Sequence, residues 1–436
     1  MTYSGGVTQR LLDIDQFKRR INRNDPVANI YRNAIDLNRY SNAVANQVVT
    51  AYNDVILSAV DDLRRIDMGV ATAGGGIVSP ASYQAQRLRV ILAQLRESLD
   101  TWAGTSTALV SGELQGLAEL QTQFITEQMR LAIRGGVADA RELLPSQIDA
   151  LQAVRTVQVS PNFAATVVSV DPTAINFTLP GTGAFNLTAG QGAAITLPNG
   201  QIVEKAFRGL AESQAQMFNT VVRNGLLTGE PTPQIARRLV GNLDFGQQAM
   251  SVRQRALAGG EVTKMANNQI MTIVRTSVQD ISNASSQQVY QANQDITGKY
   301  RYVATLDGRT SAICRSFDGR EFKYGEGPTP PVHFNCRSTT IPIIDYKALG
   351  IPPPDWGTGP SKRASKDGPV AGSLNYGEWL KQQPKAYQAE VLGSTRAAYF
   401  NKIAEKVGPR NALARMVRED GSEVTLKQLQ QRYGEP

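Results

Sequence analysis

Apolar positions in the first 156 residues recur at steps of three and four, which is the period of an amphipathic α-helix. The clearest stripe lies within residues 29–68 and contains Val44, Val48, Ala51, Val55, Ala59, Leu63 and Ile66. Two further stripes, over 81–99 and 106–134, predict two more helices, the second ended by Gly135. These faces either pack together in a bundle or leave one face to dock on a partner protein. Residues 1–156 are therefore predicted to form a helical adaptor or bundle region.

The pattern changes over residues 157–203, where Val, Ile, Thr, Gly and Asn alternate in short runs separated by Pro-Gly and Asn-Gly pairs. Such alternation is typical of β-hairpins. We therefore expect a small β-rich insert or arm, with Asn199-Gly200 as a candidate tight turn. Helical spacing returns over 204–298, where Thr232 is expected to cap a helix whose first residue is Pro233.

The next segment combines a long predicted helix, over 262–294, with short alternating runs that predict a small sheet. Residues 300–306 and 339–344 read as strands. Asp318-Gly319 is predicted to be a hairpin turn, with residues 320–324 as the return strand.

The last part of the chain begins with residues 350–373, a stretch rich in Pro, Gly and Lys that is typical of a linker. Residues 376–400 and 426–433 read as helical elements of a basic tail over 374–436. The predicted fold class is therefore α+β, predominantly α-helical. It combines a helical N-terminal half, the β insert, a core of helices and a small antiparallel sheet over 204–349, and the helical tail.

Composition and charge narrow the function classes. The chain has 436 residues and a formal net charge of +8, from 46 basic and 38 acidic side chains. Residues 301–436 hold 20 Lys and Arg against 14 Asp and Glu, so six of the eight surplus charges lie there. Such a surface would suit contact with DNA, although no dense basic run occurs and a merely solvated surface explains the charge equally well.

Targeting signals and cysteine frameworks are not apparent. The N-terminus lacks the apolar core of a signal peptide, and no run approaches the roughly 18 apolar residues of a membrane helix. Two cysteines in 436 residues do not make a disulfide framework. We therefore expect a protein without a membrane span, made in a reducing compartment, the cytoplasm.

The side chains with the strongest chemistry gather between residues 305 and 342. This segment holds both cysteines, Cys314 and Cys336, and the only histidine, His333; we call these three residues the Cys/His cluster. Four readings remain open. The cluster is a reduced, packed core, a structural zinc site, a disulfide formed outside the cell, or a thiol nucleophile with its base. No phosphate-binding Gly-rich loop, H-E-x-x-H helix or G-x-S-x-G elbow supports catalysis, so no enzyme is expected.

The order and spacing of residues in this segment resemble the signature of the phage Mu F-like minor head proteins, also called the phage head morphogenesis family. The matching residues are Asp307, Arg309, Thr310, Cys314, Asp318, Gly319, Pro330, Pro331, His333, Cys336 and Arg337. Upstream, residues 273–283 resemble the R-T-E helix of the family, with Ser277 in place of Glu. Downstream, a tail motif is similar through Tyr376, Trp379, Pro384, Gly393 and Arg396. The resemblance covers roughly residues 205–435.

The chain departs from the family at the zinc ligands. Many relatives carry C-x-x-C and H-x-x-C-x-C, enough for a closed site. Here Ser311 and Ser338 stand where the additional thiols would be. Three soft ligands remain, and the predicted oxygen ligand is Asp307 or Asp318. Arg337 is expected to pair with one of these two carboxylates and to hold the loop in place.

The resemblance implies a structural minor head protein of a tailed bacteriophage, acting in head morphogenesis at or near the portal vertex. Its implied partners are the portal protein, other capsid or neck proteins and packaged double-stranded DNA. Its implied location is the capsid interior or the neck, in an oligomeric assembly. Two other readings are a DNA-binding virion protein of genome packaging or ejection, and a thiol-dependent enzyme.

Overall fold

The computed structural model describes most of the chain, namely residues 25–68, 80–135, 137, 140–159, 177–179, 182–185, 203–242, 259–354 and 361–436. The chain divides into two compact units. Unit 1 comprises Met1–Arg39, Leu114–Gly200 and Val278–Pro436, and unit 2 comprises Tyr40–Glu113 and Gln201–Ser277. Three long helices contribute residues to both units: α2 (Pro26–Met68), α3 (Pro80–Arg134) and α9 (Glu261–Ala292). Among the described helices we find no candidate for a membrane-spanning segment.

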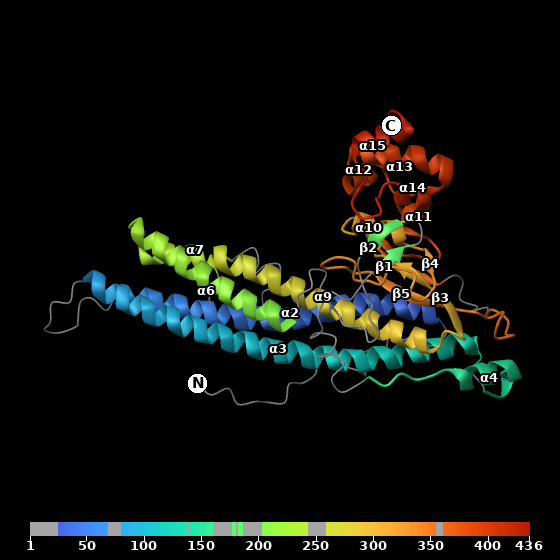
Figure 1. Ribbon diagram of the computed structural model, residues 1–436, viewed down its shortest axis with the longest axis horizontal. Helices are drawn as coiled ribbons and strands as arrows, with labels where there is room; N and C mark the ends of the chain where they lie inside the picture. The colour runs from blue at the N-terminus through green and yellow to red at the C-terminus, as the bar shows by residue number, and fades with distance from the viewer. Residues whose placement is uncertain are drawn as a thin grey trace. The chain divides into compact units, whose positions relative to one another are not determined.

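Unit 2 is helical in its described part, and α6 (Val203–Leu227) and α7 (Thr232–Val240) complete it (Figure 1). Three aromatic rings from three helices meet edge to face in its core. Tyr52 and Trp102 have centroids 5.3 Å apart, and Trp102 and Phe207 have centroids 5.6 Å apart. The indole N–H of Trp102 donates to the carbonyl oxygen of Val48, at 3.2 Å, so the buried ring keeps its hydrogen bond.

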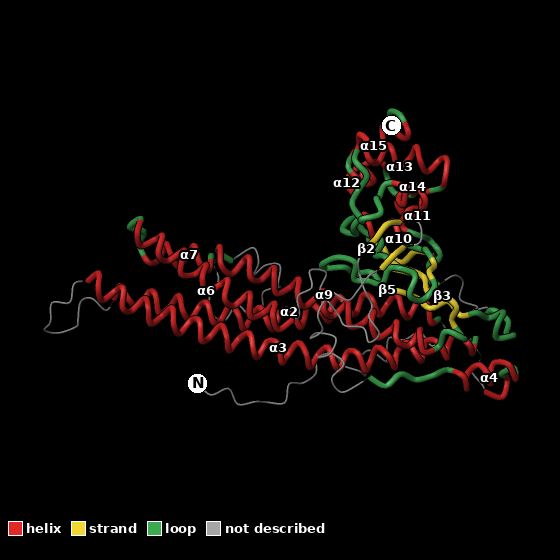
Figure 2. The backbone as a smooth tube through the Cα atoms, viewed as in Figure 1, coloured by secondary structure: helices red, strands yellow, loops and turns green. Residues whose placement is uncertain are grey.

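Unit 1 contains a three-stranded antiparallel sheet (Figure 2). Its central strand β3 (Thr297–Val303) pairs with β4 (Glu321–Phe322) on one side and with β5 (Thr339–Ile344) on the other. Tyr300 lies opposite Phe322 on one side and Pro342 on the other. Apolar residues of the sheet pack into one core with apolar residues of α2, α3, α4 (Pro145–Ala153) and α9. This core includes Tyr31, Ile125, Ile133, Val154, Val289, Tyr290, Tyr300, Val303, Ile341 and Ile344.

The C-terminal part of unit 1 is a hairpin followed by short helices. The hairpin pairs β6 (Lys362–Ser365) with β7 (Gly368–Ala371). The helices are α11 (Tyr376–Lys381), α12 (Lys385–Leu392), α13 (Ser394–Val407), α14 (Pro409–Arg415) and α15 (Leu426–Tyr433). They enclose a second core around Trp379, Leu380, Phe400 and Ile403, into which Leu306 also packs.

The predicted class, mainly helical with a small antiparallel sheet, is confirmed. The separation of 81–99 from 106–134 was wrong, because α3 is one helix. Its buried face continues through Trp102 and Ala103, and Gly104 lies in open space, where a helical glycine costs only about 1 kcal/mol. The predicted stop at Gly135 is found, with φ of 64°.

Three local predictions also need correction. Thr232 is the buried first residue of α7 and does not cap it, since Pro231 holds the cap position. Asp318-Gly319 follows a short helix, α10 (Ala312–Phe317), so the return strand β4 is present without a simple hairpin. The predicted linker over 350–373 contains the β6–β7 hairpin, because Arg363 is buried there at 4% exposure.

The predicted β-rich insert is described over two short strands. β1 (Phe177–Leu179) and β2 (Thr182–Phe185) pair antiparallel, with Leu179 opposite Thr182. The candidate turn at Asn199-Gly200 lies outside the described residues, as do residues 1–24.

Candidate functional site

The Cys/His cluster is assembled from a short helix and the loop that precedes β5. Ser311 caps α10, since its hydroxyl accepts from the backbone N–H of Cys314 at 3.4 Å. The loop contains a cis peptide bond before Pro331 and a positive φ of 56° at Asn335. The backbone N–H of Cys336 donates to the carbonyl oxygen of His333, at 3.2 Å, which keeps the two loop ligands on one turn.

The three side chains of the cluster lie in mutual contact. The Sγ atoms of Cys314 and Cys336 are 3.8 Å apart, and the Cys314 sulfur is 3.2 Å from Nε2 of His333. Both cysteines are free thiols and are buried, at 1% and 2% exposure. The same Nε2 is 2.8 Å from the hydroxyl of Ser311, and Nδ1 is 2.8 Å from the carbonyl oxygen of Phe334.

Protonation within the cluster is set by burial and mutual contact. Burial would raise the pKa of the Cys336 thiol, but hydrogen bonding with Cys314 and the charge of His333 hold that pKa well below its usual range. Burial and the neighbouring Cys336 sulfur raise the pKa of Cys314 well above its usual value. Burial lowers the pKa of His333, but contact with Cys336 raises it overall. Of the two thiols, Cys336 therefore ionises more readily than Cys314.

The geometry of the cluster fits three ligands of a tetrahedral zinc ion. With Zn–S near 2.3 Å and Zn–N near 2.0–2.1 Å, tetrahedral ligands lie about 3.8 Å apart for two sulfurs and about 3.5 Å for sulfur and nitrogen. The observed separations are 3.8 Å and 3.2 Å. In the described part of the chain, Cys314, His333 and Cys336 offer ligand atoms that all lie within 4.8 Å of one another. A metal ion there would cross-link α10 to the loop before β5.

Asp307 is held by arginine. Its two carboxylate oxygens accept from Nη1 and Nη2 of Arg337, both at 2.7 Å, which is a bidentate pair. Burial alone would raise the pKa of Asp307, but the hydrogen bonds and charge of Arg337 lower it. The hydroxyl of Thr310 donates to the carbonyl oxygen of Thr305 at 2.5 Å, which closes the same turn. Of the two partners expected for Arg337, Asp307 is the one that it reaches.

Asp318 is fully buried and saturated with donors. Its oxygens accept from the backbone N–H groups of Ala304 and Tyr376, both at 2.6 Å, and from the guanidinium of Arg363 at 3.0 and 3.1 Å. Neither Asp318 nor Asp307 lies among the ligand atoms of the Cys/His cluster, and each already accepts from an arginine, so the structure does not support their prediction as oxygen ligands. Arginine partners engage both carboxylates.

Arg363 was missed by sequence reasoning. It lies on β6, and its guanidinium also donates to the carbonyl oxygens of Ala304 and Leu374 and stacks 5.4 Å from the ring of Tyr31. Burial works to lower its pKa, but the charge of Asp318 raises it overall. A lone Arg within a Pro- and Gly-rich stretch carries no signal of burial.

The remaining signature residues support the same framework. Gly319 has φ of 75°, and a Cβ atom there would lie 3.0 Å from that of Asn375, so glycine suits the turn. Arg309 has an 81% exposed side chain, and its guanidinium lies 3.6 Å from Asp307. Its backbone N–H donates to the same carboxylate at 3.0 Å.

The tail motif joins the C-terminal helices to the signature. The hydroxyl of Tyr376 donates to the carbonyl oxygen of Asp307 at 2.8 Å. Trp379 is 1% exposed, and its ring lies edge to face with that of Tyr376, with centroids 5.1 Å apart. Pro384 precedes α12, Gly393 separates α12 from α13 with φ of 81°, and Arg396 donates to the carbonyl oxygen of Val424 at 2.6 Å.

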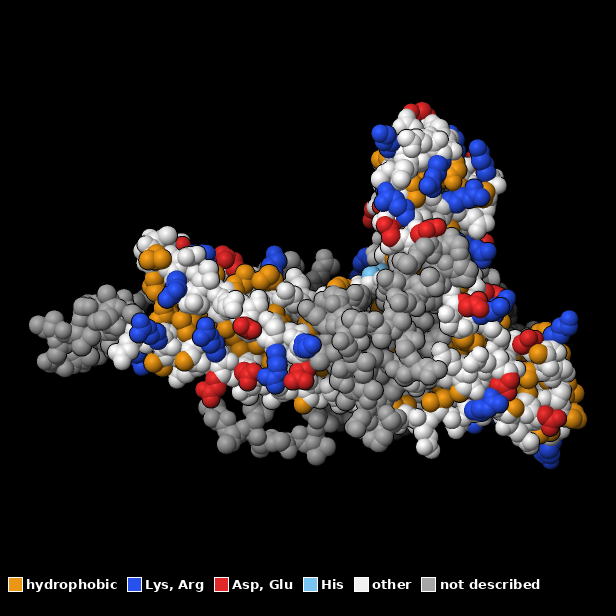
Figure 3. Space-filling model, viewed as in Figure 1, with side chains coloured by type: hydrophobic (Ala, Val, Ile, Leu, Met, Phe, Trp, Pro, Cys, Tyr) orange, Lys and Arg blue, Asp and Glu red, His pale blue; other side chains and the backbone are white. Residues whose placement is uncertain are grey.

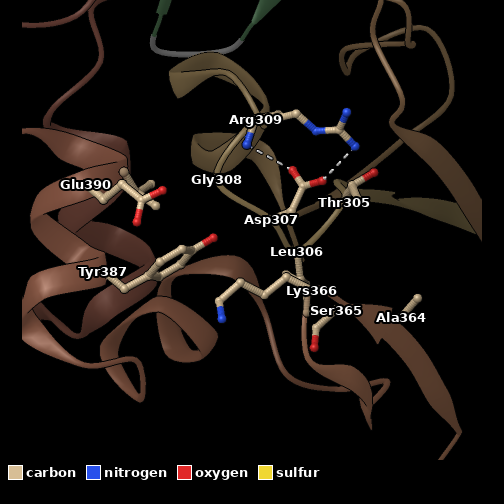
Figure 4. A pocket seen from close by; sticks show the side chains of 11 residues that line it. Thr305, Leu306, Asp307, Gly308, Arg309, Ala364, Ser365, Lys366, Tyr387 and Glu390 are labelled. Carbon is tan, nitrogen blue, oxygen red and sulfur yellow. Dashed lines mark hydrogen bonds and ion pairs between the residues drawn. The ribbon is translucent and has the colours of Figure 1, made fainter. Parts of the chain in front are cut away.

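A pocket of about 490 Å³ lies beside the Asp307 turn and is drawn in Figure 4. Tyr387 and Glu390 of α12 face the turn around Gly308, and Lys366 extends from the β6–β7 turn beneath them. The ammonium of Lys366 lies 4.5 Å from the centroid of the Tyr387 ring. The pocket has charges of both signs on its walls, and of its two acids Asp307 is already paired with Arg337.

Comparisons with known proteins bear on this region. No curated protein matches the chain, and no solved structure matches it. Residues 216–341 match a family described as Phage Mu protein F like protein. The matched segment contains the Cys/His cluster, Asp307 and Asp318, and it supports a role in phage head morphogenesis and association with the virion. The resemblance predicted from the signature is thereby confirmed for residues 216–341, the segment that matches the Phage Mu protein F like family.

Proposed function

We propose that this chain is a structural minor head protein that acts at or near the portal vertex and binds the portal protein and other capsid or neck proteins. One observation carries the proposal: both acids of the signature are engaged in internal contacts. Asp318 binds Arg363 and the N-terminus of α11, and Asp307 binds Arg337. The signature therefore joins the sheet to the C-terminal helices as one framework, which suits a protein that acts by docking.

Burial of the thiols supports binding rather than catalysis. Cys314 and Cys336 are 1% and 2% exposed. Burial and the Cys336 sulfur also raise the pKa of Cys314, the thiol that lies 3.2 Å from the histidine, so it is a poor nucleophile at neutral pH. We infer that Cys314 does not act as the nucleophile of a thiol-dependent reaction.

Co-assembly tests the docking proposal. The full chain, with an affinity tag, is expressed together with the portal protein alone, with the major capsid protein alone, and with both. Recovery of the chain with portal-containing particles, at a ratio that follows the portal and not the capsid shell, is the expected result. Equal recovery with shells that lack the portal would overturn the vertex assignment, and recovery with neither would overturn docking altogether.

Contact with packaged DNA is a second candidate, supported by the charge of the C-terminal region. Lys and Arg side chains are spread over the visible face of α12–α15 (Figure 3), and the guanidinium of Arg309 is largely exposed. Binding to double-stranded DNA would weaken with salt, with a log–log slope near −0.9 per phosphate contacted. Fluorescence anisotropy across a salt series measures this slope, and no binding at low salt would contradict the candidate.

We also propose that the Cys/His cluster holds one structural zinc ion. The fit of its two sulfurs and one nitrogen to tetrahedral spacing supports this. Elemental mass spectrometry of the purified chain, with a thiol count, tests it. About one zinc per chain with both thiols protected is expected. No metal with two free thiols would favour a packed cluster instead, and no metal with no free thiol would favour a disulfide.

A further inference from the structure

An unpaired buried oxygen lies near the Cys/His cluster. The Oδ2 atom of Asp280, on α9, is shielded from solvent and has no hydrogen-bond partner. A buried carboxylate without a partner is costly, because burial penalises its charge. Burial accordingly raises the pKa of Asp280 well above its usual value, and the charge of Cys336 raises it further. The two side chains are thus close enough to interact electrostatically.

The packing of α9 against the β5 segment holds Asp280 near the loop that carries Cys336. The side-chain amide of Gln287 donates to the hydroxyl of Thr340 at 3.1 Å, and that of Asn283 donates to the carbonyl oxygen of Ser338 at 3.3 Å. Asp280 lies three positions before Asn283, so the two side chains share a face of the helix.

Hydrogen bonds fix α9 to the segment that leads from Cys336 into β5. Gln279, next to Asp280, donates to the carbonyl oxygen of Ser338 at 2.6 Å, so two side chains of α9 hold one carbonyl only two residues from Cys336. The backbone that carries Asp280 is therefore held beside the loop that carries two of the three cluster residues. A rotation of the Asp280 side chain breaks no hydrogen bond of Oδ2.

We propose that Asp280 supplies the fourth ligand, an oxygen, of the metal ion held by Cys314, His333 and Cys336. Structural zinc is almost always four-coordinate, and three ligand atoms are in place. Carboxylate oxygen is an accepted zinc ligand. The ion would give the unpaired Oδ2 a partner, and the side chain would have to turn toward the cluster, since its oxygens are not among the atoms already within 4.8 Å of one another.

The charge of the completed site supports the assignment. Two thiolates and a carboxylate would exceed the charge of a divalent zinc ion by one. The guanidinium of Arg337, next to Cys336, interacts with the sulfurs of both cysteines and offsets that excess. Arg337 is itself held by Asp307 at 2.7 Å, so it stays beside the site.

The inference rests on the proposed zinc site and is tested by metal titration of the full-length, reduced chain. Four proteins are compared: wild type, Asp280→Asn, Ser311→Ala and Asp149→Asn. Ser311 is the competing oxygen, because its hydroxyl lies 2.8 Å from the histidine Nε2. Asp149 is an exposed acid on α4 and matches the charge change. Zinc affinity is measured by competition with a chromogenic chelator, and Co²⁺ absorption reports the ligand set.

Asp280→Asn is expected to weaken zinc binding at least about tenfold, because loss of even an outer-shell partner costs 10–100-fold. It should also change the Co²⁺ d–d bands, whereas Asp149→Asn should change neither. Asp280→Cys should keep tight binding and increase the thiolate-to-cobalt charge-transfer absorption, as expected for three thiolates instead of two. This gain of signal distinguishes a ligand from a residue that only supports the fold.

The outcomes separate the two proposals. If wild type binds no metal, the zinc site itself is wrong. If wild type and Asp280→Asn bind zinc equally tightly with the same cobalt spectrum, the zinc site stands and the assignment of Asp280 is overturned. If Ser311→Ala alone weakens binding, the fourth ligand is the serine and the assignment is likewise overturned. Circular dichroism of the metal-free variants verifies that each one folds.

Discussion

Replacing Asp318 by Asn should destabilise unit 1 strongly, because it removes the charge from a buried ion pair while keeping the shape of the side chain. Asp318 is 0% exposed and Arg363 is 4% exposed. The carboxylate accepts from Ala304 and Tyr376 as well as from the guanidinium. An Asn side chain has only one oxygen, so it cannot accept all the hydrogen bonds that the two carboxylate oxygens accept. It also leaves the guanidinium of Arg363 buried without a counter-charge.

The expected cost follows from that uncompensated charge. Removing one partner of a buried ion pair typically costs about 3–5 kcal/mol. A domain has only about 5–15 kcal/mol of unfolding free energy in total. The double variant Asp318→Asn/Arg363→Met should be more stable than Asp318→Asn alone, because it removes the unpaired guanidinium while the Asn oxygen still accepts a backbone N–H.

The assay is urea unfolding combined with hydrogen exchange, since a chain of two units need not unfold in one step. Exchange should accelerate in β6, β7 and α11, which the pair joins to the sheet. The control is Asp295→Asn, which breaks the exposed pair with Arg155 and should change stability much less because solvent screens it. A loss below about 1 kcal/mol for Asp318→Asn, or a double variant less stable than the single one, would refute the reasoning.

Three further predictions concern other parts of the chain. The Asp307–Arg337 pair lowers the pKa of Asp307 in the folded protein. The pair should therefore stabilise the fold fully above about pH 4, the pKa of Asp in the unfolded chain, and lose this effect as the pH falls through the lower pKa of the folded state. Urea midpoints measured across acid pH should fall less steeply in Arg337→Met than in wild type. Gly260→Ala should destabilise unit 2, because the added Cβ would lie closer than 3.0 Å to backbone atoms at the end of α7. Gly104→Ala should instead stabilise unit 2 by about 0.5–1 kcal/mol, because a Cβ added there, within α3, meets open space. Thermal unfolding of both variants tests the contrast. Trp379→Ala should cost about 3–5 kcal/mol, since the ring is 1% exposed, and a normal urea midpoint would show that the C-terminal core does not depend on it.

Some elements could be predicted from the sequence because their signals are local. The strand over 339–344 has β-branched residues on both faces and is found with the predicted bounds. The long stripes of α2 and α9 show helical spacing over many turns. The helix α10 could not be found in this way, since its six residues are too few to show a period, and a cap by Ser311 defines its start.

Other features depend on contacts between distant residues, which local patterns do not report. The segment around Arg363 looks like a linker by composition, yet its guanidinium is buried against a carboxylate 45 positions earlier. Burial of this one side chain orders the hairpin on which it lies. Composition measures the average character of a segment, whereas a single buried ion pair can decide whether that segment is part of the fold.

The acids near the Cys/His cluster illustrate the same limit. By sequence, Asp307 and Asp318 are the natural oxygen ligands, because they lie in the same signature as the cysteines. In the fold, each already accepts from an arginine, and a metal ion would have to displace that partner. Asp280 is distant in sequence but has an oxygen with no partner to lose. Whether a carboxylate can bind a metal ion thus depends less on its distance along the chain than on the donors that the fold has already given it.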